Sequence, residues 1–193
     1  MEGTFFAMMS RMKYIERWAL MRNTMPENIS EHSLEVAMIA HSLAIISNKR
    51  FGNSLNPEHA ACIAMFHDAT EIITGDMPTP IKYYNGGINE AFKEIEDIAA
   101  RQLIDMLPAD MKEEYESIFF PKQGEEYLWK LVKAADKISA YIKCVEERKV
   151  GNTEFRKAEI STLQSIKEMK IPEAEVFFNE FIPAYSMTLD ELT

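Results

Sequence analysis

Apolar residues recur at intervals of three and four along nearly the whole chain, which is the spacing of one face of an α-helix. The clearest case runs from residue 125 to 150, where an apolar stripe would face inward; it consists of Leu128, Leu131, Val132, Ala135, Ile138 and Ile142. No segment of useful length alternates with the period of two that a half-buried β-strand requires. The pattern therefore predicts an all-α protein.

Capping residues and prolines divide this pattern into separate helices. Asn56 and Pro57 are an N-cap followed by proline at the first helical position, whereas Gly151 suits a helix end. In the segment from Thr74 to Pro80, a glycine and two prolines prevent a helix. The predicted helices cover residues 4–20, 30–47 (with Ser30 as N-cap), 57–73, 88–107, 109–119, 125–150, 153–170 and 172–185.

Composition narrows the class of protein. The 193 residues suffice for one domain, expected to span positions 1–193, and 47% hydrophobic residues allow a sizeable core. A net charge of −10 argues against a nucleic-acid polymer or a membrane surface as partner. No apolar run approaches the roughly 20 residues of a membrane span, and the N-terminus lacks a secretory signal. Cys62 and Cys144 are expected to be free thiols, so the expected location is cytoplasmic.

One stretch, Ala64-Met65-Phe66-His67-Asp68-Ala69-Thr70-Glu71, sets two metal-capable side chains together in an otherwise apolar run. If the segment is helical, Glu71 shares a face with both His67 and Asp68. Burying an unpaired charge is costly, so such groups need a partner, a metal or an exit to water. The stretch is therefore a candidate site that needs further ligands from elsewhere.

His32 and Asp136, on two other predicted helices, could complete it. Taken alone, these residues and Glu71 have simpler interpretations. His32 could be a structural histidine, Asp136 the partner of a nearby lysine, and Glu71 a solvated residue at a helix end. Together, two imidazoles and two carboxylates form a nitrogen and oxygen set that suits a borderline divalent ion such as Co, Mn, Fe, Ni or Zn. Because no thiolate is offered, a structural zinc cluster is not expected.

The order His, His-Asp, Asp resembles the HD-domain metal-dependent phosphohydrolases. The sequence motifs around these residues resemble those of the YfbR-type bacterial 5′-deoxynucleotidases, and the resemblance covers essentially the whole chain. The motifs are Arg17-Trp18, Arg22-Asn23, Asn28-Ile29-Ser30-Glu31-His32-Ser33, His67-Asp68-Ala69-Thr70-Glu71 and Gly75-Asp76-Met77-Pro78-Thr79-Pro80. Met77 stands where the family pattern suggests Leu. The resemblance implies an HD-domain helical bundle of roughly seven to nine helices.

The resemblance also implies a reaction and its partners. A homodimer would hydrolyse deoxyribonucleoside 5′-monophosphates to deoxynucleoside and phosphate, with little preference among bases. One divalent ion, Co²⁺ or else Mn²⁺ or another borderline ion, would be held by four ligands: His32, His67, Asp68 and Asp136. Of these, His32, Asp68 and Asp136 would also lie beside the substrate.

Further residues receive roles from the same resemblance. Arg17 would orient the phosphate, because its planar fork matches phosphate oxygens. Glu71 would sit beside the metal-bound water, and Trp18 would contact the nucleotide. As our own hypotheses, Glu71 holds or deprotonates that water, and Trp18 occupies the space of a ribose 2′-hydroxyl. The sugar and phosphate pocket would be lined by Asp76, Met77, Pro78 and Thr79.

Three other interpretations remain open. An HD phosphohydrolase could act on another ester, such as a cyclic nucleotide or a nucleoside triphosphate. A triphosphate would need more basic groups than the nearby Arg17, Arg22 and Lys82, which favours a monophosphate. A catalytically silent ligand-binding module would keep a vestigial metal site, but all four ligands and Glu71 are intact. A structural dimerisation protein would leave the joint pattern unexplained.

Overall fold

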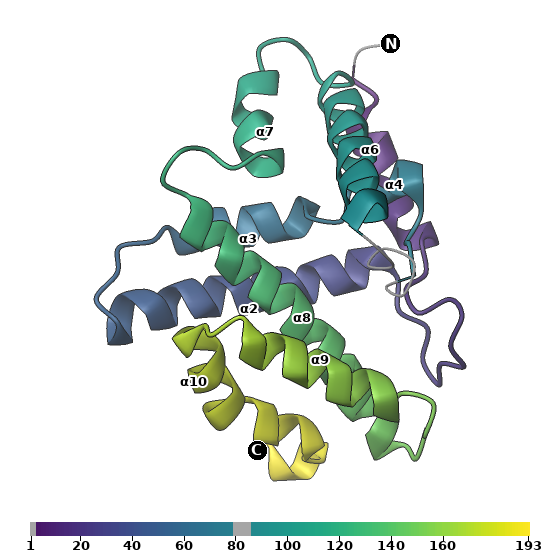
Figure 1. Ribbon diagram of the computed structural model, residues 1–193, viewed down its shortest axis with the longest axis vertical. Coiled ribbons are helices and arrows are strands. Elements are labelled where there is room, and N and C mark those ends of the chain that lie inside the picture. Colours follow the sequence, from purple (N-terminus) through teal and green to yellow (C-terminus); the bar gives the residue numbers. More distant parts are fainter. Residues whose placement is uncertain (1–2, 79–85) are drawn as a thin grey trace.

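The computed structural model describes residues 3–78 and 86–193, and within them the chain is α-helical without a β-strand (Figure 1). The principal helices are α1 (Phe5–Met9), α2 (Ile29–Arg50), α3 (Pro57–Phe66), α4 (Glu71–Thr74), α6 (Gly86–Ile104), α7 (Lys112–Phe119), α8 (Glu126–Lys149), α9 (Arg156–Glu168) and α10 (Pro172–Glu180). Short 3₁₀ helices cover Ser10–Tyr14, Ile182–Ser186 and Leu189–Glu191. The predicted all-α class is confirmed. None of the helices in this part of the chain combines the length and apolar character of a membrane span.

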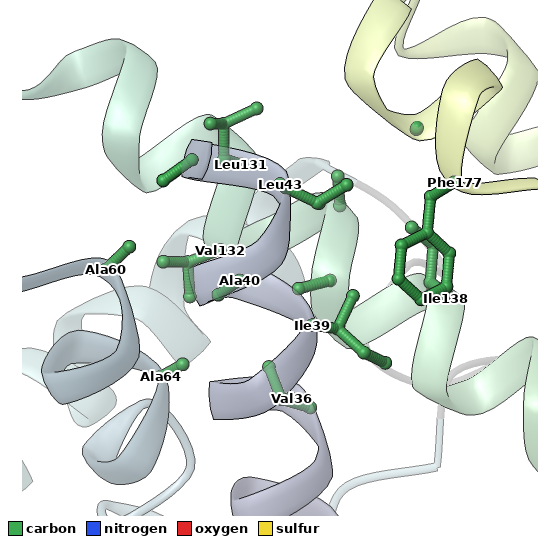
Figure 2. Close-up of a cluster of buried hydrophobic side chains, with 14 of the residues drawn as sticks. Val36, Ile39, Ala40, Leu43, Ala60, Ala64, Leu131, Val132, Ile138 and Phe177 are labelled. Atoms are coloured by element: carbon green, nitrogen blue, oxygen red, sulfur yellow. The ribbon is translucent and has the colours of Figure 1, made fainter. Parts of the chain in front are cut away.

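The main core forms where α2 and α8 cross, with α3 beside them and α10 closing one side (Figure 1). Figure 2 shows side chains of this core, among them Leu43 of α2, Leu131 and Ile138 of α8 and Phe177 of α10. Small residues such as Ala40 let the helices approach closely. This packing fixes α2, α3 and α8, the three elements that carry the candidate site, relative to one another.

A second apolar cluster joins the N-terminus to the α6–α7 end of the molecule. Phe5 is fully buried, and its ring lies 5.0 Å from that of Tyr115 and 6.1 Å from that of Phe66, measured between centroids. Leu103 and Leu107 close the cluster from the end of α6. Such aromatic pairs add to the gain from apolar burial.

The prediction of one helix over residues 4–20 is wrong beyond Tyr14. Ile15 is extended (φ −97°, ψ 109°), and Glu16 pairs with Asn28 in an isolated antiparallel bridge. The N-cap of α2 is Asn28 and not Ser30, because Asn28 forms a reciprocal capping box with Glu31. The first helical stretch is thus followed by an extended segment that pairs with the residues leading into α2.

The third predicted helix also ends early, at Phe66, and not at residue 73. Residues 67–70 form a turn, and α4 follows and stops at Gly75, whose φ of +73° suits glycine. The break therefore lies at the His-Asp pair itself. Remaining predicted boundaries hold within a few residues, and Thr79 and Pro80 fall outside the described residues.

Candidate functional site

His32, His67, Asp68 and Asp136 come together from three parts of the fold. His32 lies in the first turn of α2, His67 and Asp68 in the turn after α3, and Asp136 in the middle of α8. The Oδ2 atom of Asp68 is 3.2 Å from His67 Nε2 and 3.5 Å from His32 Nε2. Asp136 Oδ1 is 3.1 Å from His32 Nε2 and 4.0 Å from His67 Nε2. The tertiary fold thus brings together four groups that the sequence separates by up to 104 positions.

The orientation of His67 suits a cation in this cluster. Its Nδ1 lies 2.7 Å from the backbone carbonyl oxygen of Ala64, which can only accept, so Nδ1 carries a proton. In the neutral imidazole, Nε2 then presents a lone pair toward Asp68 and Asp136. This buried Nε2 makes no hydrogen bond within the described structure. A lone pair facing carboxylate oxygens is unfavourable unless a cation lies between them.

The spacing and chemical type of the potential metal-donor atoms also suit a single cation. Atoms offered by His32, His67 and Asp68 all lie within 4.8 Å of one another, a spacing that a single ion could bridge. Both cysteines are free and neither joins the cluster, as the sequence predicts. Nitrogen and oxygen donors in this mixture fit a borderline divalent ion.

Burial and close charges shift the pKa values in the cluster. Burial works against a charge on His67, but the Asp68 carboxylate outweighs it and raises the pKa of His67 to about 9. Burial likewise opposes charge on Asp68, yet His67 holds the pKa of that carboxyl well below its usual range. Against the same cost of burial, His32, whose Nε2 lies 3.1 Å from Asp136 Oδ1, lowers the pKa of Asp136 to about 2. Both carboxylates are therefore ionised at neutral pH, and a bound metal would replace the proton on His67.

Arg17 reaches the cluster from the segment between Tyr14 and α2. Its Nη1 atom lies 3.4 Å from Asp68 Oδ2, and its Nε donates to Glu27 Oε2 at 3.2 Å. The backbone N–H of Arg17 also donates to the carbonyl oxygen of Glu27 at 2.9 Å. Burial opposes its charge, but Asp68 and the other carboxylates around it raise the pKa of Arg17. A fixed, permanently charged guanidinium therefore borders the two imidazoles and two carboxylates.

Trp18 has an unusual backbone for so large a residue. Its φ is +58°, in the left-handed region, which costs on the order of 1–3 kcal/mol for a non-glycine residue. The indole N–H donates to Glu27 Oε2 at 3.1 Å, and the ring packs on Phe155 with centroids 5.3 Å apart. These contacts hold the strained residue next to Arg17.

The predicted residues around α4 are placed as follows. Glu71 opens α4 directly after the His-Asp turn and is buried, with 8% exposure. It also lies close enough to Arg17 to favour the charged guanidinium. Asp76, Met77 and Pro78 follow Gly75 and are half-buried. Thr79 lies outside the described residues.

Three polar residues of the site are not among the predicted site residues: Glu27, Glu35 and Ser139. Glu27 accepts hydrogen bonds from both Arg17 and Trp18. Ser139 lies behind His32 and donates to Glu35. Glu35 and Ser139 have one signal in the sequence, since each stands three residues after a predicted metal ligand, whereas Glu27 has none.

Comparison with known proteins places this site in context. The model of the YfbR-like family, described as 5′-deoxynucleotidase YfbR-like, matches residues 4–185. A 5′-deoxynucleotidase of Vibrio parahaemolyticus is 47% identical over 192 residues, which cover 100% of this chain and 99% of that protein. A 5′-deoxynucleotidase of Erwinia tasmaniensis is 47% identical over 189 residues, covering 98% and 96%.

Solved structures show a similar fold. An HD-domain phosphohydrolase of Listeria innocua superposes with a TM-score of 0.81 at 23% identity, covering 94% of this chain and 88% of that one. The HD phosphohydrolase of cyanophage S-2L, solved with dA and one catalytic Zn²⁺ ion, gives a TM-score of 0.66 at 21% identity, covering 95% and 99%. The helical bundle is therefore that of the HD-domain phosphohydrolases.

Proposed function

We propose that this chain, which belongs to the YfbR-like family of 5′-deoxynucleotidases, hydrolyses deoxyribonucleoside 5′-monophosphates to deoxynucleoside and phosphate. The observation that carries the proposal is the meeting of two imidazoles and two carboxylates beside a half-buried arginine. This arrangement can take a divalent ion and an anionic phosphate at the same place. A single arginine at the cluster suits a monophosphate better than a triphosphate.

One divalent ion would be held by His32, His67, Asp68 and Asp136, and we propose Co²⁺, with Mn²⁺ as the alternative. When bound, such an ion lowers the pKa of a water and offsets the charge of the phosphate. The nitrogen and oxygen ligands and the lone pair of His67 Nε2 support this assignment. The relative from cyanophage S-2L holds Zn²⁺, another ion of the same borderline class.

Arg17 would bind and orient the phosphate. Its Nε is occupied by Glu27, so the guanidinium is held with its Nη1 toward Asp68. A held fork donates two parallel hydrogen bonds to phosphate oxygens at little entropic cost. Charge on the phosphate would draw Arg17 away from Asp68, which frees that carboxylate for the ion.

Glu71 would hold the attacking water and take its proton. Its burial at the start of α4, immediately after the two ligands of the turn, supports this role. Asp76 would accept a hydrogen bond from the sugar 3′-hydroxyl, within a pocket that also includes Met77, Pro78 and Thr79. Trp18 would fill the space of a 2′-hydroxyl, and its fixed indole supports discrimination against ribonucleotides.

We further propose that the protein is a cytoplasmic homodimer. Leu34, Met38 and Ile45 form one exposed stripe along α2, and Met65 of α3 is exposed too. Side chains at positions i, i+4 and i+11 of a helix share a face, so the stripe could bury itself against a second copy. Sedimentation analysis of the wild type and of Met38→Asp would test this: the wild type should sediment as a dimer and the variant as a monomer.

Phosphate release from 5′-dAMP and 5′-AMP by chelator-treated protein, before and after restoring Co²⁺, Mn²⁺ or Mg²⁺, tests the proposed reaction. Metal-dependent release from dAMP with little from AMP is the expected result. Equal release from both would keep the phosphohydrolase and remove the sugar selectivity. No release with any metal would favour another nucleotide ester or a catalytically silent binding module.

A further inference from the structure

We propose that Glu35 and Ser139 are positioning residues for His32, which together fix its imidazole so that Nε2 is free to bind the metal. The proposal rests on the proposed metal site and adds two residues that lie behind it. Ser139 is on α8, one turn after Asp136, and Glu35 is on α2, one turn after His32. The three side chains form a continuous chain of hydrogen bonds between the two central helices.

The direction of each hydrogen bond follows from the number of protons available. The Ser139 hydroxyl has one proton, and it donates this to Glu35 Oε2 at 2.5 Å. Its oxygen lies 3.0 Å from His32 Nδ1 and has lone pairs left to accept. Nδ1 must therefore carry a proton, since the serine has no second one to give. Both His32 and Ser139 are fully buried, so water cannot replace either partner.

The consequence is a defined tautomer for His32. With the proton on Nδ1, the neutral imidazole offers the Nε2 lone pair toward Asp136 and Asp68, at 3.1 and 3.5 Å. The carboxylate of Glu35 also draws the proton along the chain and makes Nε2 a stronger donor to a metal. Without Glu35, the serine proton could turn to Nδ1 and leave the proton on Nε2, where it blocks the ligand position.

His67 provides a natural comparison within the same site. Its Nδ1 is fixed by the backbone carbonyl of Ala64 at 2.7 Å, so no side-chain substitution of that acceptor can change its tautomer. His32 depends instead on two side chains from two helices. The same variants should therefore perturb one imidazole of the site and spare the other.

Metal affinity gives the first test. Co²⁺ binding would be measured by competition with a chromogenic chelator for wild type, Ser139→Ala, Glu35→Ala and the double variant. Each single change should weaken Co²⁺ binding about 10-fold to 100-fold, the usual effect of losing a partner of a ligating histidine. The double variant should bind Co²⁺ no more weakly than the weaker-binding single variant, because both changes break the same chain of hydrogen bonds.

Ser33→Ala is the matched control. Ser33 is buried beside His32, and its hydroxyl makes no hydrogen bond in the described structure. Loss of this hydroxyl should leave the Co²⁺ affinity unchanged.

The Nδ1–H proton resonances of the zinc-loaded protein give a second, independent readout. In the wild type, His32 and His67 should each show a downfield, slowly exchanging signal. Ser139→Ala should shift or broaden the His32 signal and leave that of His67 in place.

Three results would each overturn the proposal: unchanged Co²⁺ affinity in both single variants, additive losses of affinity in the double variant, or an unchanged His32 signal. Failure of the wild type to bind one equivalent of Co²⁺ would instead overturn the metal site itself.

Discussion

The Nη1 atom of Arg17 lies 3.4 Å from Oδ2 of Asp68, the same oxygen that lies 3.2 Å from His67 Nε2. A group proposed to bind phosphate thus shares an oxygen with groups proposed to bind metal. Because both Arg17 and an incoming cation are attracted to Asp68, they compete for it when no phosphate is present. We therefore expect Arg17 to contribute to catalysis and to oppose metal binding at once.

Replacing Arg17 with Ala should separate these two effects. Loss of two charge-assisted hydrogen bonds to phosphate, at about 1.5–3 kcal/mol each, should lower kcat/KM for dAMP by about 100-fold or more. Co²⁺ affinity should stay the same or increase, since a neighbouring positive charge has gone. Arg17→Lys should recover little activity because an ammonium cannot make the parallel pair. Steady-state kinetics and chelator competition measure the two quantities.

The control for Arg17 is Arg22, whose side chain is 93% exposed and pairs only with Glu154 at 3.6 Å among the described residues. Arg22→Ala should leave both kcat/KM and Co²⁺ affinity within about twofold of wild type, as expected for an exposed ion pair. If Arg17→Ala bound Co²⁺ much more weakly, Arg17 would be supporting the fold of the site and not the phosphate.

Glu71 should be needed for turnover but not for metal binding. Glu71→Gln keeps the size of the side chain and removes its ability to accept a proton, so kcat should fall by about 100-fold to 10,000-fold. Co²⁺ should still bind in a one-to-one ratio with an affinity near that of the wild type. Loss of the metal in this variant would assign Glu71 to the ligand set and refute its role as proton acceptor.

Much of this site can be predicted from the sequence because its residue types are costly to bury. His67 and Asp68 interrupt an apolar run, and His32 and Asp136 occupy long helices with strong apolar patterns. Periodicity identified α2 and α8, and these helices carry two of the four groups. The meeting of the four groups is a tertiary contact that helical spacing alone cannot specify, and here the family resemblance supplied it.

The segment from Ile15 to Asn28 shows what periodicity could not predict. Its first apolar residues also fit a helix, but the backbone hydrogen bond from Arg17 to Glu27 and the bridge from Glu16 to Asn28 fold it into a loop with a turn at residues 17–20. Trp18 adopts a positive φ that no sequence pattern indicates. Glu27 was missed for the same reason, because its partners become neighbours only when this segment folds back on itself.

Trp18 should control selection against ribonucleotides. Trp18→Ala removes the indole that is held by Glu27 and Phe155, which opens the space proposed for a 2′-hydroxyl. The ratio of kcat/KM for AMP to that for dAMP should rise about tenfold, within the 1–3 kcal/mol that one unsatisfied hydroxyl is worth. Trp129→Phe on α8 is the matched control and should leave the ratio unchanged. An equal fall in both activities would show that Trp18 only maintains the structure.

Glu147 should stabilise the fold in a way that depends on pH. It is buried, with 1% exposure, and accepts hydrogen bonds from Lys143 Nζ at 2.6 Å and Thr24 Oγ1 at 2.7 Å. Lys143 also donates to the carbonyl oxygen of Met25 at 2.6 Å, so the pair ties the segment that carries Trp18 to α8. Burial would raise the pKa of Glu147, but these donors outweigh it and lower the pKa to about 2.

Because the pKa of Glu147 falls from its ordinary value of 4.5 to about 2 on folding, its contribution is complete above pH 4.5 and is lost as the pH falls toward 2. The shift corresponds to about 3 kcal/mol of unfolding free energy at pH 7. Glu147→Gln should therefore unfold at lower urea concentration than wild type at pH 7, and the difference should shrink by about 1 kcal/mol at pH 4. Glu116→Gln, at an exposed position of α7, is the control and should change stability by less than about 0.5 kcal/mol at either pH. If Glu147→Gln lost the same unfolding free energy at pH 4 and pH 7, the loss would come from poorer packing or hydrogen bonding of the amide. The charge on Glu147 would then contribute nothing to stability.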